Sequence, residues 1–145
     1  MENILLIIEK GADNELWGRV IFDDNLITES APSLEVLQKK FRKLLHDFHD
    51  LDPMLVHFDI AYDLTAIFSE KKYLNLSEVA QRLGINRSLM AQYAAGNKFP
   101  STERAREIEN AIHDLGRDLL DIQIAVRGKK LKRINQAKKK IKIKA

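Results

Sequence analysis

Hydrophobic and polar positions in the first sixty residues follow a strand-like spacing in four places. The apolar run 4–8 predicts a buried strand, and residues 16–22, rich in β-forming side chains, predict a second. Residues 26–28 predict a short third strand, and alternation within 55–61 predicts a fourth. Turn-forming Gly, Asp and Asn residues separate the first three strands.

A helical stripe lies between the third and fourth strands. Ser33 is a favourable N-cap, and the apolar residues after it recur three and four positions apart, which places them on one helix face. We expect this face to pack on one side of the sheet. Its members are Leu34, Leu37, Phe41, Leu44, Leu45 and Phe48. The predicted order is therefore β-β-β-α-β, followed by a helix from about residue 62 to residue 71.

Residues 75–101 predict two short helices joined by a tight turn. Asn75 caps the first helix, and Gly84 ends it because glycine accepts positive φ. Asn86 caps the second helix, which ends at Gly96. The inward-facing residues expected are Leu76, Val79, Ala80, Leu83, Ile85, Leu89, Met90 and Tyr93. A plain helical hairpin shares this outline, but the whole combination favours a helix-turn-helix, which places its second helix in the DNA major groove.

One more helix is predicted after this segment, with Thr102 as its cap and Glu103 as its first residue. Its apolar stripe comprises Ala105, Ile108, Ile112, Leu115, Leu119 and Leu120. Together with Ile122, Ile124 and Val126, the end of this stripe carries more apolar surface than a small core needs. A contact in a homodimer or higher homo-oligomer is one explanation, and packing within the chain is the other.

Charge is distributed unevenly along the 145 residues. Of the 24 Lys and Arg residues, ten lie in the tail 127–145, which has no acidic residue. The remaining 14 basic residues face 21 acidic ones in residues 1–126, a net charge of −7. Such asymmetry indicates an anionic partner for the tail. Non-specific phosphate contacts are expected from Lys129, Lys130, Lys132 and Arg133. A solvated tail without a partner is the alternative.

Composition argues against several other classes of protein. There are no cysteines, so disulfides and thiol chemistry are excluded, and the four histidines show no metal-ligand spacing. No apolar run approaches the ~20 residues of a membrane span, and no signal peptide is evident. We expect a cytoplasmic protein with no cofactor, no metal and no membrane contact.

A metal-dependent nuclease is the one catalytic alternative. Two-metal chemistry needs carboxylates that converge, and the candidates are Glu2, Glu9, Asp23 and Asp24. Asp23 and Asp24 lie in a predicted turn and Glu9 ends a strand, so each is better explained as a solubilising surface group. We therefore expect no enzymatic activity and no catalytic residues.

The segment 75–101 resembles the XRE family of phage-repressor-like DNA-binding domains in its turn glycine, its exit glycine and the loop Asn-Lys-x-Pro-Ser at 97–101. The resemblance implies base contacts from Arg87, Ser88 and Gln92. The chemistry agrees, because Arg can donate two hydrogen bonds to guanine and Gln can pair with adenine. Phosphate contacts are expected from Asn75, Asn86, Asn97 and Lys98. Leu76 departs from the family, which often has a polar residue there.

Most of the chain up to about residue 120 resembles the HicB family of antitoxins. The resemblance lies in the first strand and turn at 7–14, the Trp17 strand, the Ser-Leu-Glu helix start at 33–35, the join Phe-Asp-Ile-Ala-Tyr-Asp-Leu at 58–64, and residues 108–120. Asp-Asn-Leu at 24–26 departs from the Pro-Gly turn of many relatives. The implied fold is α+β. It has a partial ribonuclease-H-like domain at 1–61, an all-α helix-turn-helix domain at 62–126 and the basic tail at 127–145.

This resemblance implies two partners. One is a small HicA-like ribonuclease toxin, neutralised by the N-terminal domain as in a type II toxin–antitoxin pair. The other is double-stranded operator DNA, through which the protein represses its own operon. The alternative is a stand-alone XRE-type repressor whose N-terminal domain binds a ligand or associates with itself. Residue chemistry independently supports only the DNA-binding half.

Overall fold

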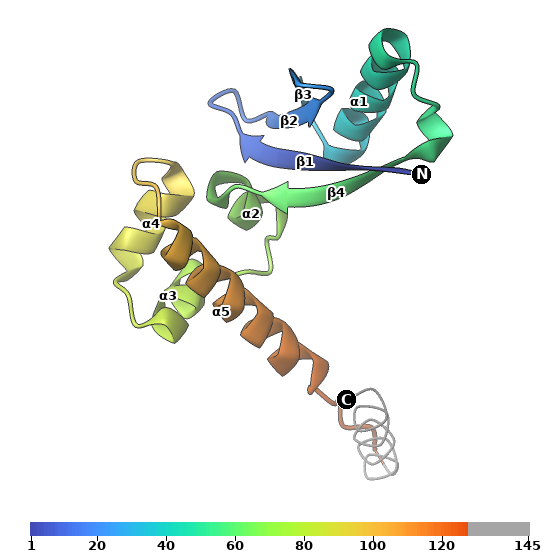
Figure 1. Cartoon of the computed structure of the whole chain (residues 1–145). Coiled ribbons are helices and arrows are strands. Elements are labelled where there is room, and N and C mark those ends of the chain that lie inside the picture. Colours follow the sequence, from blue (N-terminus) through green and yellow to red (C-terminus); the bar gives the residue numbers. More distant parts are fainter. Residues whose placement is uncertain (128–145) are drawn as a thin grey trace.

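The computed structural model describes residues 1–127 (Figure 1). Lys129, Lys130, Lys132 and Arg133, for which phosphate contacts are predicted, lie outside the described residues. The described chain has an α+β fold in which a four-stranded mixed sheet precedes a group of helices. The element order begins β-β-β-α-β, as predicted from the hydrophobic pattern.

The sheet contains β1 (Glu2–Lys10), β2 (Leu16–Phe22), β3 (Asn25–Ala31) and β4 (Val56–Tyr62) in the spatial order β3-β2-β1-β4. The first three strands form antiparallel pairs, whereas β4 pairs parallel to β1. A parallel pair needs a crossover connection, which here consists of α1 (Leu34–His49) and the short 3-10 turn η1 (Pro53–Leu55). β4 therefore begins at residue 56 rather than at the predicted residue 55.

α1 covers one face of the sheet. Its buried residues Leu37, Phe41 and Leu45 pack against alternate residues of β1 and β2. Gly18 makes this close approach possible, because a Cβ at that position would lie 2.7 Å from the ring of Phe41. Phe48 does not belong to this packing, contrary to the prediction: it is 76% exposed, and the last turn of α1 meets β2 through His49 instead, whose ring lies edge-on to that of Phe22.

α2 (Leu64–Glu70) joins the sheet to the remaining helices. It begins two residues later than predicted, because Tyr62 still pairs with β1 and Asp63 provides the N-cap. Ala66 is buried in the sheet-side core, whereas Leu64 and Phe68 pack against the helical core. One short helix thus contributes to both cores. The division of the chain into domains at residue 61 stays a prediction.

The helical core lies between α3 (Leu76–Leu83), α4 (Arg87–Ala95) and α5 (Thr102–Leu120). Its buried residues are Val79, Ala80, Met90, Tyr93, Ile108 and Ala111. Ser101 caps α5 by accepting a hydrogen bond from the backbone N–H of Arg104 at 3.1 Å. The predicted cap, Thr102, is instead the first helical residue, because Ser101 has the extended backbone conformation of a cap.

Candidate nucleic-acid interface

α3 and α4 are joined by a short turn whose geometry is set by local side chains. The Oδ1 atom of Asn75 accepts hydrogen bonds from the backbone N–H groups of Ser77 and Glu78, at 2.8 and 3.3 Å. The Oδ1 atom of Asn86 accepts from Ser88 N–H at 2.8 Å. Since each cap uses its carbonyl oxygen, the amide N–H₂ of both exposed asparagines remains a donor at the surface.

Glycines end both helices. Gly84 follows α3 with φ 71°, and Gly96 follows α4 with φ 79°, the left-handed conformation that residues with a Cβ adopt at a cost. The predicted caps and ends of the two helices are confirmed, because each depends on residues within a few positions in the sequence. α3 and α4 thus form a compact pair with two capped N-termini at the surface.

Arg87 is the first residue of α4 and is exposed. Its Nε–H donates to the hydroxyl of Ser77 on α3 at 2.6 Å, which fixes the start of the side chain. The guanidinium keeps four other N–H groups, enough for two parallel hydrogen bonds to one acceptor edge. Ser88 lies beside it and is also exposed. The sequence alone does not indicate the role of Ser77, because its partner is ten residues away.

Gln92 differs from the other two predicted base-contacting residues. It is half-buried, and its Oε1 atom is buried without a hydrogen-bond partner in the described chain. Reading adenine with two hydrogen bonds requires both the oxygen and the nitrogen of the amide to be accessible. In this conformation the oxygen is not, so Arg87 and Ser88 present the accessible polar groups at the start of the helix.

The loop after α4 holds the last two predicted phosphate-contacting residues. The backbone N–H groups of Asn97 and Lys98 donate to the carbonyl oxygen of Gln92, at 3.0 and 3.3 Å. Both side chains are exposed. Gly96 lies against Thr65 of α2, where a Cβ would come within 3.2 Å of the Thr65 methyl group. The loop is therefore packed onto the helix that connects it to the sheet.

Basic side chains on this surface have different partners. Arg82, on α3, forms an ion pair with Asp118 of α5, so its charge is already compensated. Arg87 is bound only to a neutral hydroxyl, and Lys98 makes no ion pair within residues 1–127. Two uncompensated positive charges thus flank α4, one at each end.

The carboxylates considered for nuclease chemistry do not converge. Glu9 pairs with Arg19 at 3.3 Å, and Asp23 and Asp24 form the turn between β2 and β3 with positive φ. Among residues 1–127, no three His, Asp or Glu side chains are grouped closely enough to hold one ion. Asp47 accepts a hydrogen bond from Lys43 at 2.5 Å, which lowers the pKa of its carboxyl group.

No family model, curated protein or solved structure matches the chain. The likeness to XRE-type domains and to HicB antitoxins therefore rests on the residues that carry it, and both assignments stay predictions.

In the part of the chain that the structure describes, none of the helices combines the length and the apolar content that crossing a bilayer requires.

Proposed function

We propose that the chain is a DNA-binding transcriptional regulator in which α3 and α4 form a helix-turn-helix and α4 is the recognition helix. The observation that carries this proposal is the position of Arg87. Its exposed guanidinium stands at the first turn of α4 and is held by Ser77. Recognition helices contact base edges mainly through their N-terminal residues, and Arg bound to guanine is the commonest specific contact.

The dimensions of α4 support the same proposal. Asn86 presents a donor at the start of α4 and Asn75 presents one at the start of α3, and Asn97 and Lys98 follow the end of α4. At 1.5 Å per residue, the nine residues of α4 span roughly 13 Å, close to the major-groove width of about 12 Å. Donors at both ends can therefore contact phosphates on opposite sides of one groove, which positions the helix without reading the sequence.

Replacing Arg87 by alanine tests the recognition-helix assignment. We expect specific affinity to fall by roughly 1–3 kcal/mol, about 5- to 150-fold, with relaxed preference at one base pair. Fluorescence anisotropy with DNA from the promoter of the protein's own operon measures both effects. Arg106→Ala is the matched control, because Arg106 is also an exposed arginine but belongs to α5 rather than α4. Equal affinities for wild type and Arg87→Ala would show that α4 does not read DNA at this position.

We further propose that the protein is the antitoxin of a type II pair and that its sheet domain neutralises a small HicA-like ribonuclease. Beyond the family resemblance, two features support this. The sheet face opposite α1 is open and partly apolar, with Leu5, Trp17, Ile21 and Leu26 exposed. Residues 1–126 carry a net charge of −7, which suits a partner that is basic because it binds RNA.

Purification together with the products of the neighbouring genes tests the antitoxin proposal. We expect one small basic product to co-purify and to cleave RNA only after the complex is separated. Ile21→Lys should restore RNA cleavage in the mixture, because it places a positive charge on the open sheet face. Phe48→Lys is the matched control, since Phe48 is equally exposed on α1. If no neighbouring product binds or cleaves RNA, the stand-alone repressor is the better description.

A further inference from the structure

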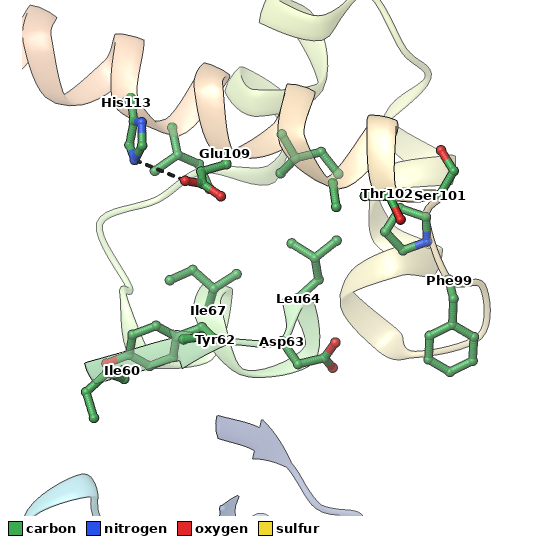
Figure 2. A pocket seen from close by; sticks show the side chains of 15 residues that line it. Ile60, Tyr62, Asp63, Leu64, Ile67, Phe99, Ser101, Thr102, Glu109 and His113 are labelled. Carbon is green, nitrogen blue, oxygen red and sulfur yellow. Dashed lines mark ion pairs between the residues drawn. The ribbon is translucent and has the colours of Figure 1, made fainter. Parts of the chain in front are cut away.

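A groove of about 730 Å³ separates α5 from the end of β4 and from α2 (Figure 2). Leu64 and Ile67 point across it toward α5. Glu109 and His113 lie at its rim, with 3.9 Å between Glu109 Oε1 and His113 Nε2. Most of the lining is apolar and comes from both sides, namely Ile60, Tyr62, Leu64, Ile67, Ala105 and Ile112. The two walls thus leave apolar side chains incompletely packed.

The α5 face that lines the groove continues beyond it. Ala105, Ile112 and Leu119 are spaced by seven residues, which keeps them on one side of the helix. Within residues 1–127, no other element covers the second half of this face, because α5 extends away from the sheet and the other helices (Figure 1). Leu119 and Leu120 are 58% and 75% exposed, and Ile122 just after the helix is 57% exposed. We refer to residues 119–126 as the arm.

Gly116 lies on this same face, between Ile112 and Leu120. A Cβ at Gly116 would meet nothing within 4 Å, so packing within one chain does not require glycine there. Glycine inside a helix costs about 1 kcal/mol relative to alanine. The absence of a side chain does, however, allow a second helix to approach closely, since interhelical distance depends on side-chain size at the contact.

We propose that a second copy of the chain covers both surfaces. Two α5 helices cross antiparallel at Gly116, and the arm of each copy lies in the groove of the other. The two-fold arrangement follows from the positions along α5, since Ile112 and Leu120 are each four residues from Gly116, in opposite directions. Leu120 of one copy then faces Ile112 of the other, and the contact is repeated by symmetry. This pairing rests on α5 alone and not on DNA binding.

Disulfide trapping in the absence of DNA tests the crossing point, because the chain has no cysteine of its own. Gly116→Cys should form a covalent dimer under mild oxidation, since the two positions meet within the 4.4–6.8 Å that a disulfide spans between Cα atoms. Asn110→Cys is the control: it is exposed on the same helix but lies roughly 120° around it. Equal dimer yields for the two variants would overturn the pairing.

The relative direction of the two α5 helices is tested by Leu120→Cys. In an antiparallel pair, the two copies of this position are about 12 Å apart along the helix axes, so the variant should remain monomeric on a non-reducing gel. Mixed with Ile112→Cys, it should give a covalent heterodimer. Cross-linking of Leu120→Cys with itself would contradict the antiparallel arrangement.

The mass in solution gives a second readout that needs no oxidation. Wild type should sediment at twice the chain mass, and Gly116→Met should sediment as a monomer. A methionine side chain at position 116 is accommodated within a single chain, because the space around Gly116 is open. In the dimer, the same side chain would occupy the space that the second helix needs. Asn110→Met should remain a dimer. A monomeric wild type, or a dimeric Gly116→Met variant, would overturn the proposal, whatever the result of the Arg87 experiment.

Discussion

Replacing Phe41 by alanine is expected to lower the free energy of unfolding by about 3–5 kcal/mol. Phe41 is fully buried at the centre of the sheet-side core, where its ring meets the ring of Phe58 edge-on, with 6.3 Å between centroids. Gly18 brings β2 against the same ring. Because three elements converge on this side chain, the cavity left by truncation cannot close without moving a strand.

Phe48→Ala is the matched control for this prediction. The two phenylalanines lie on one helix, seven residues apart, but Phe48 is 76% exposed. Its replacement should change stability by no more than about 0.5 kcal/mol. Urea unfolding followed by circular dichroism gives both values. Comparable losses for Phe41→Ala and Phe48→Ala would mean that α1 packs on the sheet over its whole length, as the hydrophobic stripe alone suggests.

Phe48 also shows what hydrophobic periodicity cannot predict. The spacing of Leu37, Phe41 and Leu45 identifies the face that α1 buries, and all three are buried. The same spacing includes Phe48, but where a helix leaves its sheet depends on the sheet's extent. That extent is set by the pairing of strands that are separated in the sequence, which the spacing within α1 does not contain. Periodicity therefore predicts the face, but not where coverage of that face ends.

The features of the candidate nucleic-acid interface likewise fall into local ones, which the sequence predicts, and tertiary ones, which it does not. The caps at Asn75 and Asn86 and the turns at Gly84 and Gly96 are predicted correctly, because each interaction spans only a few residues. The buried oxygen of Gln92, the Arg87–Ser77 hydrogen bond and the Arg82–Asp118 ion pair are not predicted. These features depend on how α3, α4 and α5 meet. The sequence does not predict the groove beside α5 for the same reason.

Replacing Met90 by alanine is the second change with a large expected effect, a loss of about 2–5 kcal/mol in the free energy of unfolding. Met90 is fully buried, and in the described part of the chain it is one of only six buried residues in the helical core. With so few residues in this core, the others cannot compensate for the lost contacts. Met54→Ala is the matched control, because Met54 is 85% exposed and its truncation should change stability by no more than about 0.5 kcal/mol.

Comparison of Met90→Ala with Arg87→Ala separates support of the interface from direct contact with DNA. Met90 is fully buried whereas Arg87 is exposed, so Met90 cannot touch a base while α4 stays folded. We expect Arg87→Ala to weaken DNA binding at unchanged stability, and Met90→Ala to weaken it near the unfolding transition, where α4 is no longer held. Anisotropy titrations at rising urea concentrations distinguish the two. Met90→Ala should bind like wild type in buffer and lose binding at a lower urea concentration. A loss of affinity by Met90→Ala in buffer, with folding intact, would mean that α4 is not a rigid reading element.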